Sequence, residues 1–143
     1  ELLPRLLREK GVAYENNPNL DIREYIHDMP DCLAAADLVI ARAGAITLAE
    51  LTAVGRASVL IPSPNVAENH QYHNAMVLAD HKAAVVIEEK DLTGEKLVAA
   101  VKEMTADPEK LREISLAAKA LGVPNACGHI TDELLDLYKT HRK

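Results

Sequence analysis

Two clusters of small and polar residues have the composition to bind a phosphorylated ligand. The first runs from Arg42 through the small residues 43–45 to Glu50, and the second covers residues 69–74, Asn-His-Gln-Tyr-His-Asn. An apolar run at 38–40 precedes the first cluster and a helical pattern follows it. The free N–H groups at such a helix start favour a phosphate. Together the clusters predict a site for a phosphorylated ligand that is rich in hydroxyl groups.

The glycine of the first cluster has two interpretations. Gly44 could serve only the tight turn between strand and helix. Alternatively, its small neighbours let a ligand approach the backbone, and the amides of Ala45, Ile46 and Thr47 bind a diphosphate at the positive end of the helix dipole. The cluster contains neither a Walker lysine nor a Gly-x-Gly-x-x-Gly pattern, so the sequence supports neither an ATPase nor a dinucleotide site.

Two charged side chains flank this turn, and each has two interpretations. Glu50 either complements the helix dipole or accepts hydrogen bonds from both hydroxyls of a ribose, because its neighbours are apolar. Arg42 either pairs with a phosphate or braces a loop, and the residues favour both roles equally.

The second cluster opens another predicted helix, with Asn69 in the position of a helix cap. Gln71 and Asn74 lie three residues apart and share one helix face, where their amides suit the hydroxyls of a sugar. His70 and His73 also share a face, but two histidines without a third ligand are weak evidence for a metal, and we predict no metal site.

The composition is that of an ordinary globular protein and argues against several functions. The chain has 143 residues, which fits one domain, and a net charge of −6, which argues against binding nucleic acid. Four tyrosines without Phe or Trp predict an aliphatic core. No apolar run reaches the length of a membrane span. Cys32 and Cys127 are expected to be free, buried thiols in a reducing cytoplasm.

Strands that alternate with helices would position these residues. The pattern predicts strands at 20–26, 38–41, 58–61 and 83–87, and helices at 2–10, 31–36, 46–54 and 69–80. Helices alone follow, starting at 93 and 107 and covering 126–141. We therefore predict an α/β fold: a Rossmann-like, doubly wound parallel sheet with a helical C-terminal tail. Ligands of such sheets bind beyond the carboxyl ends of the strands, so residues 25–28 form a third candidate group.

The motifs, taken in order, resemble one family of glycosyltransferases. They are Tyr25-Ile26-x-Asp28-Met29-Pro30, Arg42-Ala43-Gly44-Ala45-x-Thr47-x-x-Glu50, Ile61-Pro62-Ser63-Pro64 and Asn69-His70-Gln71-x-x-Asn74-Ala75. With this spacing, the chain from about residue 19 to its end resembles the C-terminal half of the MurG family. That family belongs to glycosyltransferase family 28 and has the GT-B fold, in which two Rossmann-like domains face a cleft.

The resemblance implies the donor-binding half of an inverting N-acetylglucosaminyltransferase. Such an enzyme moves N-acetylglucosamine from UDP-N-acetylglucosamine to the C4 hydroxyl of lipid I and gives lipid II in peptidoglycan synthesis. By position, the nucleotide would lie at 25–26, the diphosphate at 45–47, the ribose at 50 and the sugar at 71 and 74. His70 stands where many relatives have glutamine. The implied donor-binding residues are Tyr25, Ile26, Arg42, Gly44, Ala45, Ile46, Thr47, Glu50, His70, Gln71 and Asn74.

The resemblance also implies the partners of the chain. The general base and the acceptor contacts belong to the N-terminal domain of such enzymes, so we expect residues 1–143 to be a single UDP-sugar-binding domain without a catalytic residue. Because the chain starts at Glu1 without Met, we expect a fragment that binds the donor weakly and does not turn over. The implied full-length protein needs no cofactor or active-site metal. It lies peripherally on the cytoplasmic face of the bacterial cell membrane and binds UDP-N-acetylglucosamine and lipid I, but no nucleic acid.

Three alternatives stay open at this point. The first is another GT-B enzyme, such as a diacylglycerol glucosyltransferase. The second is a non-catalytic UDP-sugar-binding subunit of a two-chain glycosyltransferase. The third is a purely structural α/β module, which would bind no nucleotide.

Overall fold

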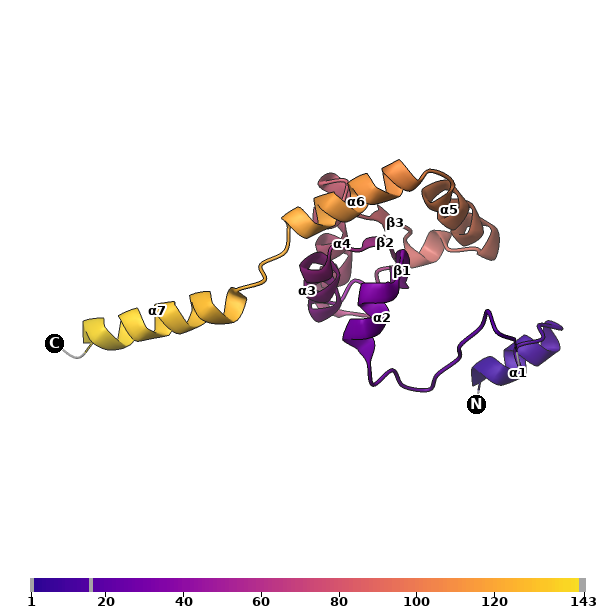
Figure 1. The fold of residues 1–143 in the computed structure, drawn as a ribbon, viewed down its shortest axis with the longest axis horizontal. Helices are drawn as coiled ribbons and strands as arrows, with labels where there is room; N and C mark the ends of the chain where they lie inside the picture. The colour runs from indigo at the N-terminus through magenta and orange to yellow at the C-terminus, as the bar shows by residue number, and fades with distance from the viewer. Residues whose placement is uncertain (1, 16, 142–143) are drawn as a thin grey trace.

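The computed structural model describes residues 2–15 and 17–141 and is built around a three-stranded parallel sheet (Figure 1). The strands β1 (Leu38–Ala41), β2 (Ala57–Leu60) and β3 (Val85–Val86) lie in the order β1-β2-β3. Leu38 pairs with Ala57, and Val59 pairs with Val85. Consecutive strands are therefore neighbours, each joined to the next by a crossover helix.

The helices account for most of the remaining chain. They are α1 (Leu2–Glu9), α2 (Met29–Ala35), α3 (Ala45–Val54), α4 (His70–Asp80), α5 (Gly94–Ala106), α6 (Pro108–Ala120) and α7 (Ala126–His141). Two short 3-10 turns, η1 (Ala67–Asn69) and η2 (Glu89–Asp91), precede α4 and follow β3. These bounds confirm the predicted helices to within a few residues.

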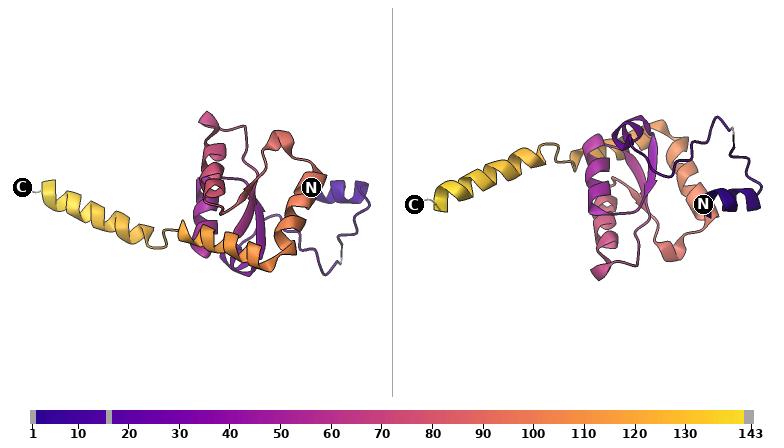
Figure 2. Two further views of the ribbon diagram at one scale, coloured as in Figure 1. Left: turned by 90° about the horizontal axis from the view of Figure 1, so that it is seen from above. Right: turned by 90° about the horizontal axis from the view of Figure 1, so that it is seen from below.

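Each face of the sheet has its own apolar core, because successive side chains of a strand point to opposite faces. On one face Leu60 packs with residues of α3 and α4, among them Leu51 and Leu78. On the other face Val59 packs with Met104 of α5 and with residues of α6. Figure 2 shows α4 and α5 on opposite sides of the strands. The predicted doubly wound α/β fold is confirmed.

The helix ends follow from local chemistry. The side chain of Thr93 accepts a hydrogen bond from the N–H of Lys96 at 3.1 Å and caps α5. The side chain of Asp107 caps α6 in the same way, ahead of a proline at the first helical position. Helix α3 ends at Gly55, which has the left-handed φ of +75° that favours glycine. Lys119 of α6 lies against Gly55 and donates a hydrogen bond to the carbonyl of Ala53, at the carboxyl end of α3.

The strand predicted at 20–26 is wrong, because this segment is a loop. Its apolar residues alternate as in a strand, but Leu20 and Ile22 are 43% and 39% exposed. Alternation reports which side chains share a face, whereas a strand also needs a neighbour for its backbone. No strand in the described part of the chain pairs with this segment. The remaining strands are close to the prediction, with β2 shifted by one residue and β3 shorter than expected.

The C-terminal tail is helical, as predicted, and α7 extends away from the rest of the molecule in Figure 1. The apolar side chains of this helix are exposed, from 50% for Leu135 to 61% for Leu134. Cys127 on the same helix is also exposed, and Cys32 is half-buried, so the expectation of buried thiols is wrong, although both are free. No helix among the described residues is both long enough and apolar enough to cross a bilayer.

The core around α3 can be tested with a single truncation. Leu51 is fully buried, so Leu51→Ala should lower the free energy of unfolding by about 2–5 kcal/mol. Urea denaturation followed by circular dichroism measures this change. Leu116 on α6 is 57% exposed, and Leu116→Ala should change the same quantity by less than about 0.5 kcal/mol. Equal losses in the two variants would contradict this placement of the core.

Candidate functional site

The loops that follow the three strands meet at the carboxyl edge of the sheet, and Arg42 joins them. Arg42 follows β1, and its Nη1 donates a hydrogen bond to the carbonyl of Ile61, just after β2, at 3.3 Å. The same nitrogen is ion-paired with Glu89, which opens the turn after β3. The loop-bracing interpretation of Arg42 is therefore supported by its contacts. The sequence reasoning missed Glu89, although its position directly after a predicted parallel strand placed it at this edge.

Helix α3 presents free backbone donors at its start. The first bond within the helix runs from the N–H of Leu48 to the carbonyl of Gly44, at 3.0 Å. The N–H groups of residues 45–47 therefore have no acceptor within the helix. Ala45 and Ile46 are exposed, with Ile46 at 77%. Three adjacent donors at the positive end of a helix dipole suit a phosphate.

Gly44 is not explained by the geometry of the turn. Its φ of −68° and ψ of 146° are extended values that any residue adopts. A Cβ added there would meet only the Thr47 hydroxyl, at 3.8 Å, an ordinary contact. Alanine or serine would fit in its place, so the interpretation that remains is close approach of a ligand to the backbone. The neighbouring Ala43 is fully buried and anchors this loop to the core.

Glu50 lies on α3 beyond the first turn, which contains no acidic residue. The influence of a helix dipole on a side chain falls off within that turn, so dipole complementation explains Glu50 poorly. The side chain is exposed and forms no hydrogen bond or ion pair with any other described residue. Its carboxylate is thus available to a ligand that sits over the helix start.

The second cluster is attached to the loop after β2 through Gln71. The Oε1 of this side chain accepts a hydrogen bond from the N–H of Ser63 at 2.9 Å, which leaves its NH2 group as a donor. Asn74 is half-buried one turn further along α4. His70 turns back, and its Nδ1 lies 2.9 Å from the carbonyl of Ala67. Asn69 occupies the N-cap position as predicted, but its side chain makes no capping bond.

Two further features border the second cluster. The backbone enters α4 through Glu68 and Asn69, both with a φ of +51°, a left-handed conformation that is costly for residues other than glycine. A hollow of about 280 Å³ lies beside them. Its lining residues are Pro62, Pro64, Asn69, Tyr72, Glu88, Glu89 and Lys90.

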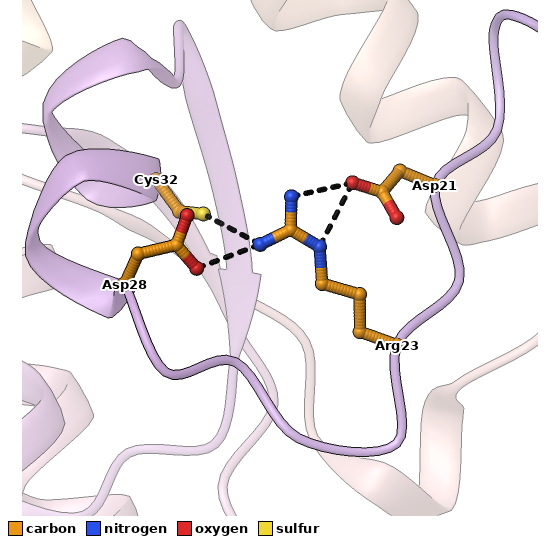
Figure 3. Close-up of polar contacts among 4 residues, drawn as sticks. All are labelled: Asp21, Arg23, Asp28 and Cys32. Atoms are coloured by element: carbon orange, nitrogen blue, oxygen red, sulfur yellow. Dashed lines mark hydrogen bonds and ion pairs between the residues drawn. The ribbon is translucent and has the colours of Figure 1, made fainter.

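The third group, at 25–28, is not joined to the α3 start by any hydrogen bond or ring contact within the described ranges. Tyr25 is 71% exposed, and its ring centroid lies 4.8 Å from that of His27. Ile26 is half-buried. The sequence reasoning did not notice Arg23, whose guanidinium lies between Asp21 and Asp28 in Figure 3.

The uncompensated positive charge of the site comes mainly from the backbone. Glu89 compensates the positive charge of the Arg42 guanidinium. The backbone amides at the start of α3 are therefore the main positive feature of the site. Among the residues that the structure describes, no three His, Cys, Asp or Glu side chains lie close enough together to hold a metal ion. The arrangement can bind an anion at the helix start and hydroxyl groups at Glu50, Gln71 and Asn74.

Known proteins share this sequence and fold. Residues 6–130 match the Glycosyltransferase family 28 C-terminal domain. A Desulforamulus reducens protein named UDP-N-acetylglucosamine–N-acetylmuramyl-(pentapeptide) pyrophosphoryl-undecaprenol N-acetylglucosamine transferase is 48% identical over 124 residues, which cover 87% of this chain and 33% of that protein. The protein of the same name from Bacillus subtilis is 44% identical over 133 residues, 93% of this chain and 36% of that protein. The crystal structure of Acinetobacter baumannii MurG matches with a TM-score of 0.78 and 29% identity, over 92% of this chain and 39% of that one. The chain spans about a third of the length of the curated relatives it matches.

The role of Gly44 can be tested with serine. Serine is a preferred N-cap, and its hydroxyl would accept a hydrogen bond from the same helix-start amides that an anion needs. We expect Gly44→Ser to keep or raise the melting temperature while weakening inorganic pyrophosphate binding by roughly fivefold or more. Differential scanning and isothermal titration calorimetry measure the two quantities.

Gly94→Ser is the matched control. A Cβ at Gly94, in the first turn of α5, meets nothing within 4 Å, so this variant should bind pyrophosphate as the unchanged chain does. Undiminished pyrophosphate binding in Gly44→Ser would show that the start of α3 is not the anion site.

Proposed function

We propose that this chain binds UDP-N-acetylglucosamine, the nucleotide-sugar donor of a glycosyl transfer. The chain belongs to the Glycosyltransferase family 28 C-terminal domain family. The names of the similar transferases from Desulforamulus reducens and Bacillus subtilis support this donor. The observation that carries the proposal is the start of α3, where exposed amides lie one turn before an exposed carboxylate without a partner among the described residues.

The spacing along α3 suits a nucleoside diphosphate. Glu50 lies four residues after Ile46 and three after Thr47, so it shares a helix face with both. The rise from Ala45 to Glu50 is about 7.5 Å, comparable with the separation between a phosphate and the ribose hydroxyls of one nucleotide. In this proposal the amides of residues 45–47 bind the diphosphate and Glu50 accepts hydrogen bonds from the ribose.

The sugar would lie toward α4. Gln71 already uses its oxygen to hold Ser63, so it is pre-positioned to donate from its NH2 group. Asn74 lies on the same helix face and offers both a donor and an acceptor. The third group would receive the uracil, with the Ile26 backbone as its hydrogen-bonding partner and Tyr25 beside it.

The proposed reaction is an inverting transfer to the C4 hydroxyl of lipid I, which gives lipid II. The hydroxyl gives its proton to a general base as it attacks the anomeric carbon, the bond to the diphosphate breaks, and the departing UDP carries the negative charge. The amides at the start of α3 would stabilise that charge, so the donor site needs no metal or other cofactor in this proposal. The contribution of this chain is to bind and orient the donor and to stabilise the leaving group.

The acceptor and the general base would belong to the remaining two-thirds of a full-length protein, since the chain spans about a third of its curated relatives. A lipid-linked acceptor supports a membrane location for the proposed full-length enzyme, and we propose the cytoplasmic face. We propose that the 143-residue chain binds donor but does not transfer sugar by itself.

Glu50 provides the direct test of the donor site. We expect Glu50→Gln to weaken UDP binding about tenfold or more, since hydrogen bonds to a charged group contribute roughly 1.5–3 kcal/mol. The unchanged chain should bind UDP more tightly than 2′-deoxy-UDP, and Glu50→Gln should lose most of this preference. Isothermal titration calorimetry with both nucleotides measures the two affinities.

Glu133→Gln is the control, because Glu133 is an exposed glutamate on α7, away from the sheet edge. Equal UDP binding by Glu50→Gln and the unchanged chain would refute the ribose assignment. Tighter binding of UDP-glucose than of UDP-N-acetylglucosamine would favour a glucosyltransferase instead. No UDP binding at all would favour a purely structural module.

A further inference from the structure

We propose that Arg23 is a positioning residue that clamps the segment 21–28 and thereby holds Tyr25 and Ile26 in place for the uracil. The inference rests on the proposed donor-binding function and adds a residue that the motifs of the site do not include. It concerns the affinity of the chain for the base of the nucleotide, separately from its affinity for the phosphates.

The guanidinium of Arg23 has partners on both sides of the segment. Its Nε and Nη2 lie 2.9 Å and 2.7 Å from the same carboxylate oxygen of Asp21. Its Nη1 donates to Asp28 at 2.7 Å and lies 3.9 Å from the Sγ of Cys32. Figure 3 shows the guanidinium between the two carboxylates. Tyr25 and Ile26 lie in the span of chain that this contact closes.

Backbone hydrogen bonds do not hold this segment. Among the described residues, the backbone N–H groups of 21–27 donate to no backbone carbonyl. In the described ranges such bonds flank the segment: Leu20 donates to Asn17, and Asp31 and Cys32 donate to Asp28. Tyr25 is largely exposed, so burial in the core does not fix it either. The side chain of Arg23 is therefore the main polar restraint on the loop.

The Asp28 carboxylate pairs with Arg23 instead of capping helix α2. Asp28 occupies the N-cap position of α2, where an aspartate carboxylate normally accepts a hydrogen bond from the first turn of the helix. Here the carboxylate makes no capping bond and pairs with Arg23 instead. The Asp28 backbone carbonyl still accepts from the first turn of α2, so Asp28 attaches the loop to that helix.

Helix α2 is itself tied to α3, whose start is the proposed phosphate site. Arg56 follows α3 and donates hydrogen bonds to the carbonyls of Leu33 and Ala34 at the end of α2. The two helices also pack against each other. Arg23 thus fixes the loop to a helix that is held beside the diphosphate site, and this sets where the base can lie relative to the phosphates.

A lysine would not replace Arg23. An exposed ion pair contributes little by its charge alone, but a planar guanidinium reaches two carboxylates in one fixed geometry. Its hydrogen bond also holds the pKa of Asp21 below the ordinary value, so this carboxylate stays charged at neutral pH. The arginine shape, rather than the positive charge, is therefore the feature to test.

The test compares UDP with inorganic pyrophosphate in the 143-residue chain. We expect Arg23→Gln and Arg23→Lys to weaken UDP binding by roughly threefold to tenfold, because an unclamped loop must be ordered on binding. Pyrophosphate binding should stay unchanged, since it does not use the loop. NMR relaxation of the ligand-free chain should show lower backbone order parameters at residues 22–27. Arg112→Gln, which removes an exposed arginine paired with Glu109 on α6, should change none of these quantities.

The possible outcomes separate this inference from the proposed function. Equal UDP binding by Arg23→Gln and the unchanged chain would overturn the clamp, and so would equal losses for UDP and pyrophosphate, which would indicate general damage. If the unchanged chain binds UDP no more tightly than pyrophosphate, the proposed donor site itself fails, and the clamp has no base to position.

Discussion

Parallel pairing of β1, β2 and β3 obliges the chain to cross back after β1 and after β2, and these crossovers contain α3 and α4. Because all strands point the same way, both helices begin at the same edge of the sheet. β2 is buried along its whole length, so this arrangement cannot slip without exposing the centre of the core. For this reason three parts of the site are neighbours: the start of α3, the face of α4 that carries Gln71 and Asn74, and the turn after β3.

At that edge, the side chains divide into those that hold the loops and those that stay available. Arg42 ties three loops together, Ala43 anchors the turn in the core, and one atom of Gln71 secures the loop after β2. Groups that could meet a ligand, namely the first amides of α3 and the Glu50 carboxylate, have no partner among the described residues. A site organised in this way needs little rearrangement on binding, which is the condition for electrostatic stabilisation of a leaving group.

Local patterns were enough to predict most of the elements, including β1, α3 and α7, because apolar periodicity and caps are encoded within a few residues of each other. The strand expected at 20–26 was wrong because strand formation depends on a distant partner, which periodicity does not report. The contact of Arg42 with Glu89 was missed for the same reason, because it joins loops that follow different strands. The contact of Gln71 with Ser63 joins α4 to the loop ahead of it and depends on the path of that loop, which periodicity does not report either. At Gly44 the structure excluded an interpretation that the sequence had left open. Its backbone angles show that the turn between strand and helix does not require glycine.

Lys119 makes the two ends of α3 differ in how far their partial charges are compensated. Its ammonium is fixed at the carboxyl end of the helix, where it offsets the partial negative charge of the last carbonyls. Among the described residues, no side chain is bonded to the amino end, which keeps its partial positive charge. The carboxyl end of the helix is therefore compensated within the protein, whereas the amino end keeps its partial charge for a ligand. An anion would gain this attraction on contact with the turn, and added salt would weaken it.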